Sequence, residues 1–306
     1  MKIAIVGQQD FGKAVLEACL ARGDQVAAVF CAPEKEGARP DALRAAAQEK
    51  GLTLHQFKSL KAPEAAQAMQ AAGADLGIMA FVLQFAPQAF VNTPRCGTLQ
   101  YHPSLLPKYR GPSSINWPIV RGEQETGLSI FRPTDGLDEG AVILQKKTPI
   151  GDNDTLGNVY FDRLFPMGVQ AMLEAADRVL AGMHKETVQD ESQASYEGWF
   201  REAEARIHWH NHVDAIHDLI RGADPAPGAW TTLGGQKLQL YDSRKERART
   251  FGAVRGKIGE ILGVEDGRLV IAAQGGRIHA GKVKLGDGKK VAAAEAGIQA
   301  GQILGT

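Results

Sequence analysis

The first 80 residues alternate between short apolar runs and segments of helical periodicity, and this alternation constrains the fold more than any other feature. Three apolar runs and three helical patterns follow one another, at residues 2–6, 11–22, 25–31, 41–50, 63–72 and 76–81. Strands that alternate with helices of about ten residues are typical of a parallel sheet with helices on both faces. We therefore predict a doubly wound α/β domain with a mostly parallel, Rossmann-like sheet, closed by a further helix over about 159–181.

The sequence changes character after about residue 205. A helix is expected near 214–221, and short alternating runs separated by glycine-rich turns then follow, at 237–241, 257–262, 268–272 and 282–285. Short strands at this spacing predict a small, OB-like β-barrel. With 306 residues, two domains are expected. We place the α/β domain at 1–205, with a polar linker at about 183–205, and the barrel at 206–306.

The composition excludes several classes of protein. Lys plus Arg and Asp plus Glu both number 35, so no overall charge attracts the chain to nucleic acid or to anionic lipid. Cys19, Cys31 and Cys96 show neither even pairing nor metal-ligand spacing, which favours a reducing compartment. The opening MKIAIVG is too short for a signal peptide, and no stretch of about 18 apolar residues follows. We expect a cytoplasmic protein that does not bind a membrane.

The first glycine-containing loop, residues 7–14, is close to a phosphate-binding P-loop but lacks its metal ligand. Ala14 stands where a P-loop needs Ser or Thr, and Gln9 stands where a dinucleotide fingerprint needs its second glycine. We therefore predict a tight turn rather than a nucleotide site. The same absence disfavours a nicotinamide-dependent oxidoreductase.

A histidine and an aspartate in two separate loops are the best candidates for chemistry. His102 lies between an apolar strand end and Pro103, and Asp138 lies 36 residues later in a turn between Gly136 and Gly140. In doubly wound sheets, ligands bind beyond the carboxyl ends of the strands, where such loops converge. A histidine can polarise a carbonyl or transfer a proton near neutral pH, and a nearby carboxylate can help to activate a water or an amine.

The motifs around these two residues resemble the folate-dependent formyltransferases. His-Pro-Ser-Leu-Leu-Pro at 102–107 is followed by Arg110-Gly111, by Ser-Ile-Asn-Trp at 114–117 and by Gly-Leu-Asp-x-Gly at 136–140. The resemblance continues through 195–198, 216–222 and 227–230 and so covers essentially the whole chain. Within the family, the motifs are most similar to the N-terminal 10-formyltetrahydrofolate hydrolase domain of the formyltetrahydrofolate dehydrogenases, with the two-domain layout of the methionyl-tRNA formyltransferases.

This resemblance implies a formyl donor, a division of roles and a folate site. The donor would be 10-formyltetrahydrofolate, and no metal would be needed. His102 would act as general acid or oxyanion partner, and Asp138 would activate the nucleophile and contact the folate. The pterin would lie against two backbone segments, formed by Gln84, Phe85 and Ala86 and by Ser104, Leu105, Leu106 and Pro107.

One position departs from the family pattern. Many members carry Asn two residues before the histidine, where its amide donates to the formyl oxygen, whereas this chain carries Gln100. Glutamine keeps the amide on a longer arm, and a misplacement of about 1 Å can reduce the rate on the order of a hundredfold. Asn116 is a second candidate donor, with capping of the following helix as the alternative.

The formyl acceptor is open at this point. Water would give formate and tetrahydrofolate, which we expect, whereas an amine, an amino sugar or methionyl-tRNA would make the chain a transferase. A dense basic run could contact tRNA, but a solvated loop is the favoured interpretation, so tRNA is possible but not favoured. The run consists of Arg244, Lys245, Arg247, Arg249, Arg255 and Lys257. A non-catalytic folate-binding module is disfavoured because a binder gains nothing from a His–Asp pair.

A second histidine cluster is interpreted as a surface feature. His208, His210 and His212 alternate, so on a strand they would share one face, as a metal site requires. No cysteine or acidic cluster accompanies them to complete a ligand set. We therefore expect no metal.

Overall fold

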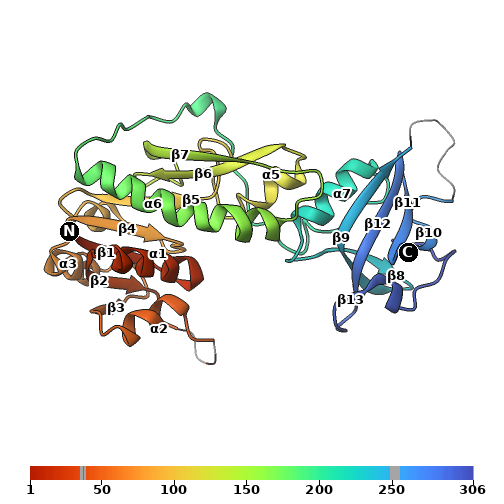
Figure 1. Cartoon of the computed structure of the whole chain (residues 1–306), viewed down its shortest axis with the longest axis horizontal. Coiled ribbons are helices and arrows are strands. Elements are labelled where there is room, and N and C mark those ends of the chain that lie inside the picture. The colour runs from red at the N-terminus through yellow and green to blue at the C-terminus, as the bar shows by residue number, and fades with distance from the viewer. Residues whose placement is uncertain (35–36, 38, 249–255, 306) are drawn as a thin grey trace. The chain divides into compact units, whose positions relative to one another are not determined.

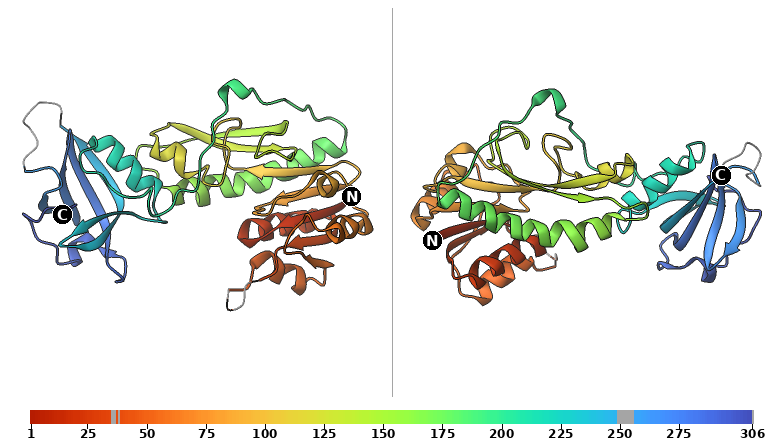
Figure 2. Two further views of the ribbon diagram at one scale, coloured as in Figure 1. Left: turned by 180° about the vertical axis from the view of Figure 1, so that it is seen from behind. Right: turned by 45° about the horizontal axis from the view of Figure 1, so that its top comes forward.

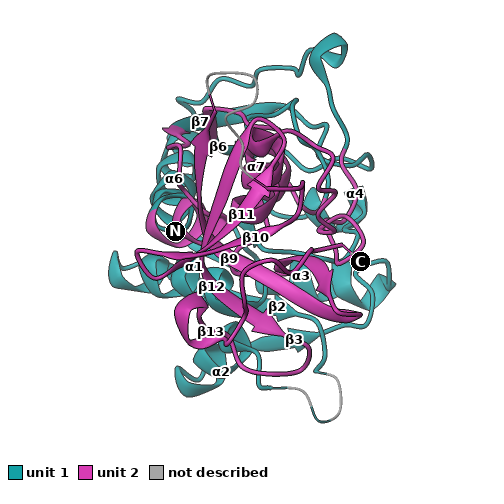
Figure 3. Cartoon of the chain, turned by 90° about the vertical axis from the view of Figure 1, so that its right-hand side faces the viewer, with its two compact units in different colours: residues 1–111, 127–147, 163–196 teal, residues 112–126, 148–162, 197–306 magenta. Residues whose placement is uncertain are grey.

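The structure is a computed structural model that describes residues 1–34, 37, 39–248 and 256–305. The chain divides into two compact units, each assembled from three segments (Figure 3). The first unit comprises residues 1–111, 127–147 and 163–196, and the second comprises 112–126, 148–162 and 197–306. Within the described part of the chain, no helix combines the length and apolar character needed to cross a membrane.

The first unit is built on a seven-stranded sheet in the order β3-β2-β1-β4-β5-β6-β7 (Figure 1). The strands from β3 to β5 are parallel, whereas β6 runs antiparallel to β5. The predicted parallel α/β sheet is thus confirmed, with an antiparallel addition. The strands are β1 (Lys2–Gly7), β2 (Gln25–Cys31), β3 (Leu54–Gln56), β4 (Leu76–Ala80), β5 (Thr98–His102), β6 (Glu125–Phe131) and β7 (Val142–Pro149).

Helices cover both faces of this sheet (Figure 1, Figure 2). On one face, the Tyr101 ring of β5 contacts Phe11 of α1 with 4.3 Å between centroids, and Phe11 contacts Phe165 of α6. On the other face, Met69 of α3 and Phe90 of α4 are buried against β1 and β2. The helices are α1 (Gln9–Ala21), α2 (Ala42–Glu49), α3 (Pro63–Ala72), α4 (Gln88–Val91) and α6 (Phe165–Leu180), and a π-helix (Asn158–Leu164) precedes α6.

Local sequence signals explain where these helices begin and end. Asp41 precedes α2, and its carboxylate accepts a hydrogen bond from the Arg44 N–H, which satisfies one of the free amides of the first turn. Pro63 occupies the first turn of α3, where its missing N–H costs nothing. Gly73 ends that helix with φ of 59°, a left-handed conformation that favours glycine.

The second unit contains an antiparallel sheet in the order β10-β11-β12-β9-β8, and β13 pairs with β12. The predicted barrel is not confirmed, because the sheet is not closed in the described residues. The C-terminal residues Leu304 and Ile303 make only isolated bridges, to Leu233 and Glu260 near its two edges. The elements are α5 (Asn116–Val120), α7 (Val213–Gly222), β8 (Ala229–Leu233), β9 (Gln236–Arg247), β10 (Ile261–Glu265), β11 (Arg268–Ala273), β12 (Gly276–Leu285) and β13 (Val291–Ala292).

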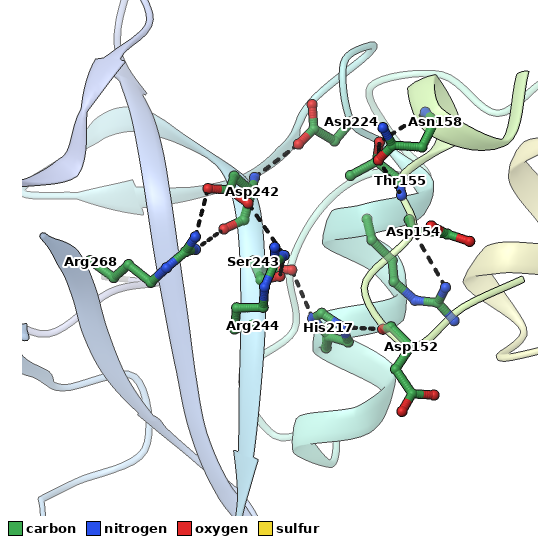
Figure 4. A network of polar contacts seen from close by, with 11 residues as sticks. Asp152, Asp154, Thr155, Asn158, His217, Asp224, Asp242, Ser243, Arg244 and Arg268 are labelled. Carbon is green, nitrogen blue, oxygen red and sulfur yellow. Dashed lines mark hydrogen bonds and ion pairs between the residues drawn. The ribbon is translucent and has the colours of Figure 1, made fainter. Parts of the chain in front are cut away.

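A buried histidine joins three elements of the second unit (Figure 4). The His217 side chain, on α7, is fully buried. Its Nε2 lies 2.9 Å from the Asp152 carbonyl oxygen, and its Nδ1 lies 2.8 Å from the Ser243 hydroxyl. Because a carbonyl only accepts, Nε2 carries the hydrogen and Ser243 donates to Nδ1. A neutral imidazole therefore satisfies both of these contacts.

This histidine makes the stability of the protein depend on pH. Burial lowers the pKa of His217 and outweighs the hydrogen bond to the Asp152 carbonyl, which raises it. Of the nearby charges, Lys245 and Arg221 lower this pKa and Asp218 raises it. As the pH falls below about 6.5, the unfolded state binds more protons at this site than the folded state. As the pH falls, protonation of His217 in the unfolded state should lower the free energy of unfolding by up to about 1.4 kcal/mol per pH unit. The variant His217→Gln should lack this dependence on pH. Urea unfolding at pH 7.5 and pH 5.5 tests this; an unchanged difference between the two pH values in the variant would contradict it.

Candidate active site

The structure places His102 and Asp138 side by side in the first unit. His102 is the last residue of β5, and its Nδ1 lies 3.5 Å from Oδ2 of Asp138. Both side chains are buried, with 7% and 8% of their surface exposed. The two predicted residues therefore form a pair that is largely shielded from water, where electrostatic interactions are stronger than at the surface.

The backbone of residues 109–111 holds both members of the pair. The Tyr109 carbonyl lies 2.8 Å from His102 Nε2, and the Gly111 N–H donates to Asp138 Oδ2 at 2.9 Å. Tyr109, Gly111 and Asp138 have φ of 58°, 103° and 55°, all in the positive region. Residues other than glycine adopt such conformations when surrounding contacts enforce them, and they are common at functional sites.

These contacts fix which nitrogen of His102 is available for chemistry. A carbonyl only accepts, so Nε2 carries a hydrogen that it donates to Tyr109. Nδ1 then faces the Asp138 carboxylate, and a hydrogen bond between them requires one further proton. The arrangement can therefore hold a proton between Nδ1 and Oδ2 and exchange it with a bound group.

Gln100 lies on the same face of β5 as His102, since alternate residues of a strand share a face. Its side chain is partly buried, and its carboxamide has no hydrogen-bond partner among the residues that the structure describes. Tyr101, between them, points to the opposite face, toward α1. The Gln100 amide is thus free to donate to a molecule bound beside His102.

A cavity of about 310 Å³ opens in the first unit at the start of the same strand. Thr98, the first residue of β5, lines it, and so does Thr134, whose hydroxyl is buried without a partner in the described protein. Unpaired buried hydroxyls are uncommon in proteins and indicate a missing partner. The lining consists of Gln88, Val91, Asn92, Gly97, Thr98, Arg132, Pro133, Thr134 and Glu186.

The segment from Gln84 to Ala86, predicted to contact the pterin, lies directly before α4. The Gln84 amide donates to the Phe57 and Lys58 carbonyls at 2.9 and 3.1 Å, so its side chain anchors the segment. The Phe85 ring is 45% exposed, and Lys61 Nζ lies 4.8 Å from its centroid. None of the three residues lines the cavity.

The second predicted segment, Ser104 to Pro107, is attached to the sheet through its own polar groups. Ser104 is buried, and its hydroxyl donates to the Lys108 carbonyl at 2.7 Å. Leu106 is buried, and its N–H donates to the Ser129 hydroxyl at 3.1 Å. Ser104 and Leu106 therefore hold the loop against the sheet. The backbone of the loop and the partly exposed Leu105 and Pro107 remain accessible to a ligand.

Asn116 belongs to the second unit, and its amide donates to the Gly222 carbonyl at 2.9 Å. The alternative that Asn116 caps the following helix is wrong. The helix α5 begins at Asn116 itself, after Ile115, and has no side-chain cap. The side chain instead joins α5 to the end of α7.

The three alternating histidines do not form a metal centre. His208, His210 and His212 are exposed, and His212 Nδ1 accepts from the Asp214 N–H at 3.3 Å at the start of α7. In the described ranges, no three His, Cys, Asp or Glu side chains gather as a metal site requires.

Two buried polar residues near the pair were missed in the sequence analysis. Arg110 is fully buried, and Gln189, in the predicted linker, is 7% exposed and contacts the Asp138 loop. A buried arginine has no distinctive sequence pattern, although its place between Tyr109 and Gly111 in a conspicuous motif was a usable signal.

The chain thus combines a mostly parallel α/β sheet, with a buried His–Asp pair at a strand end, and an antiparallel C-terminal sheet. The chain belongs to the formyl transferase family: residues 1–176 match the family described as formyl transferase, and residues 200–299 match its C-terminal domain. The predicted family is confirmed.

Relatives in the family differ in the reactions for which they are named. The chain is 34% identical over 304 residues to the mitochondrial 10-formyltetrahydrofolate dehydrogenase of Mus musculus, covering 96% of this chain but only 33% of that protein. It is 37% identical to the methionyl-tRNA formyltransferase of Ruegeria pomeroyi, with 91% and 90% of the two chains covered. The chain thus spans about a third of the dehydrogenase and nearly all of the transferase.

Solved structures share the fold at low sequence identity. An N-formyltransferase from Helicobacter canadensis, in complex with folinic acid and dTDP-3-aminofucose, superimposes with a TM-score of 0.69 at 19% identity, covering 92% of this chain and 98% of that one. HypX from Aquifex aeolicus, in complex with tetrahydrofolic acid, gives a TM-score of 0.68 at 20% identity, covering 96% of this chain and 46% of that one. Each of these two proteins is named in complex with a folate compound.

Proposed function

We propose that the protein is an enzyme that removes the formyl group of 10-formyltetrahydrofolate. The observation that carries the proposal is the buried contact between His102 and Asp138. His102 ends the strand β5, and Thr98, at the start of that strand, lines the cavity. A pair that holds one proton beside a free amide donor suits acyl transfer, in which a proton moves while negative charge develops on a carbonyl oxygen.

The cavity is the proposed site of the pterin ring. From Thr98 in its wall to His102, four residue steps along β5 span about 13 Å. The pterin of a folate is joined to N10 through a single methylene, so a pterin in the cavity would direct N10 and its formyl group along β5 toward His102. The Thr134 hydroxyl and the amides of Gln88 and Asn92 offer polar partners for the ring.

The proposed reaction proceeds through two proton transfers. Asp138 accepts a proton from the attacking nucleophile as that nucleophile bonds to the formyl carbon. The protonated Nδ1 of His102 and the Gln100 amide donate to the resulting oxyanion. When the bond from carbon to N10 breaks, His102 delivers its proton to N10, and tetrahydrofolate leaves. Preorganised donors and acid–base groups of this kind each contribute about 10²- to 10⁴-fold to a rate.

Water is the proposed acceptor, with an amine as the alternative. The near-complete match to a methionyl-tRNA formyltransferase favours the alternative. The basic run argues against tRNA, because three of its four described side chains are paired: Arg244 with Asp242 at 3.3 Å, and Lys245 and Arg247 with Asp214 at 2.9 and 2.7 Å. The fourth, Lys257, is exposed and makes no ion pair with a described residue. Arg249 and Arg255 lie outside the described residues. Paired charges release few counterions from a polyanion and so provide little affinity.

Release of tetrahydrofolate distinguishes these reactions. The protein is incubated with 10-formyltetrahydrofolate alone, then with small amines, an amino sugar nucleotide or methionyl-tRNA. Hydrolysis predicts equal amounts of formate and tetrahydrofolate without any acceptor. Release that requires an acceptor would establish a transferase, and no release under any condition would overturn the proposal.

The position of the pterin is tested by Thr134→Val, which removes the unpaired hydroxyl at nearly constant volume. Losing one hydrogen bond of about 0.5–1.5 kcal/mol should raise the dissociation constant of tetrahydrofolate roughly two- to tenfold. Thr232→Val, on β8 of the second unit, is the matched control. Titration calorimetry measures both variants, and an unchanged affinity in Thr134→Val would place the ring elsewhere.

A further inference from the structure

We propose that Gln189 is a positioning residue that fixes the direction in which the Asp138 carboxylate points, and that Arg110 fixes the orientation of the Gln189 carboxamide. The inference rests on the proposed function of the His102–Asp138 pair. It assigns an active-site role to a residue in a segment that the sequence predicted to be a linker.

The Gln189 carboxamide spans the turn that carries Asp138. Its Nε2 donates to the carbonyls of Asp138 and Gly140, at 2.8 and 2.7 Å. Both hydrogens of the amide are therefore donated to the same turn, to two carbonyls that lie two residues apart. The side chain is only 7% exposed, so water does not replace these bonds readily. The backbone on both sides of the carboxylate is thus held from outside its own loop.

Arg110 determines which way the carboxamide points. Its Nε and Nη2 donate to Gln189 Oε1 at 3.1 and 2.8 Å. A flipped carboxamide would place its NH₂ group against the guanidinium and its oxygen against two carbonyls. Every contact would then join two donors or two acceptors, so only one orientation is compatible with the site.

Arg110 is itself held by the segment that contains Gln189. The guanidinium is fully buried and donates to both Glu191 carboxylate oxygens, at 2.6 and 3.0 Å, and to the Tyr196 hydroxyl at 2.7 Å. With the two bonds to Gln189, all five N–H groups of Arg110 are used. We name residues 189–196 the strap.

The strap therefore acts on the pair by two routes. Through Gln189 it holds the Asp138 backbone, whose φ of 55° is unusual for a residue other than glycine. Through Arg110 it fixes the neighbouring peptide groups, which accept from His102 and donate to the Asp138 carboxylate. The distance of 3.5 Å between His102 Nδ1 and Asp138 Oδ2 therefore depends on the contacts of both Gln189 and Arg110.

The test replaces Gln189 with methionine, which has a similar size and no hydrogen bonds to offer. A displacement of about 1 Å in the carboxylate should lower kcat on the order of 10- to 100-fold. The dissociation constant of tetrahydrofolate should stay within about twofold, since Gln189 does not line the cavity. Gln193→Met is the matched control, because the side chain of that exposed strap glutamine bonds, among the described residues, only to Asp190.

A double-mutant cycle separates positioning from a general structural effect. If Gln189 acts through Asp138, then Gln189→Met should have little further effect on kcat in an Asp138→Asn protein. Additive losses, or an equal loss in Gln193→Met, would overturn the inference. Gln189→Glu provides a second variant that keeps the contact with Arg110 and lacks the two N–H donors, so it should also lose kcat while remaining folded.

Failure of this inference differs from failure of the proposed function. If the wild-type protein releases no tetrahydrofolate, the proposed function fails. If the wild type is active and Gln189→Met and Gln189→Glu both keep its kcat, only the positioning role fails.

Discussion

Replacing Asp138 with asparagine should lower the turnover of 10-formyltetrahydrofolate by about 10²- to 10⁴-fold, the range expected for loss of a general acid–base group. Asparagine cannot accept the proton of the nucleophile at Oδ1. Its amide oxygen can still accept the bond from the Gly111 N–H. Asparagine also tolerates a φ of 55°, so the loop should keep its shape. Folate affinity should remain within a few fold of the wild type.

Asp135→Asn is the matched control for this substitution. It makes the same chemical change in the same loop, at an exposed position. Steady-state release of tetrahydrofolate measures turnover, and titration with tetrahydrofolate measures affinity. Near-native turnover in Asp138→Asn would show that Asp138 does not activate the nucleophile. An equal loss in both variants would attribute the effect to the loop rather than to the carboxylate.

The position of His102 could be predicted because its causes are local. An apolar strand that ends in His-Pro places the side chain at the carboxyl edge of a parallel sheet, where ligands bind. Its partner Asp138 lies in a turn whose glycines mark it in the sequence. The resemblance to a family then identified the two as a pair, and the structure places them 3.5 Å apart.

The supporting residues could not be predicted because they depend on contacts between distant segments. Gln189 follows Asp138 by 51 residues, in a stretch without apolar periodicity, so the sequence there is indistinguishable from a linker. Only the buried guanidinium of Arg110 explains why a polar strap crosses the site. The cavity likewise has walls from α4, the start of β5, residues 132–134 and Glu186.

The open C-terminal sheet shows a different limit. Strand spacing predicted a barrel, but closure depends on whether the edge strands pair, and pairing depends on register. At one edge, the register of β10 against β11 shifts between Ile261 and Gly263. A glycine at such a position is typical of a bulge, which bends a strand and interrupts its ladder. The run predicted at 257–262 accordingly becomes a strand only from Ile261.

Replacing Arg110 with methionine should lower the free energy of unfolding by about 2–4 kcal/mol, the largest stability effect that we expect from a single substitution. The change removes five hydrogen bonds and leaves the buried Gln189 oxygen without a donor. Glu191 is 66% exposed, so its carboxylate can regain water, which limits the loss. The strap should detach locally before the sheet unfolds.

Arg178→Met isolates the effect of burial. Arg178 also donates to a glutamate at 2.6 Å, the distance between Arg110 and Glu191, but its side chain is 45% exposed on α6. Exposed pairs of this kind contribute about 0.3–0.5 kcal/mol. Urea unfolding of both variants compares the two arginines directly. Equal losses would mean that the ion pair alone matters; a loss several times larger in Arg110→Met would mean that the buried contact with Gln189 stabilises the site.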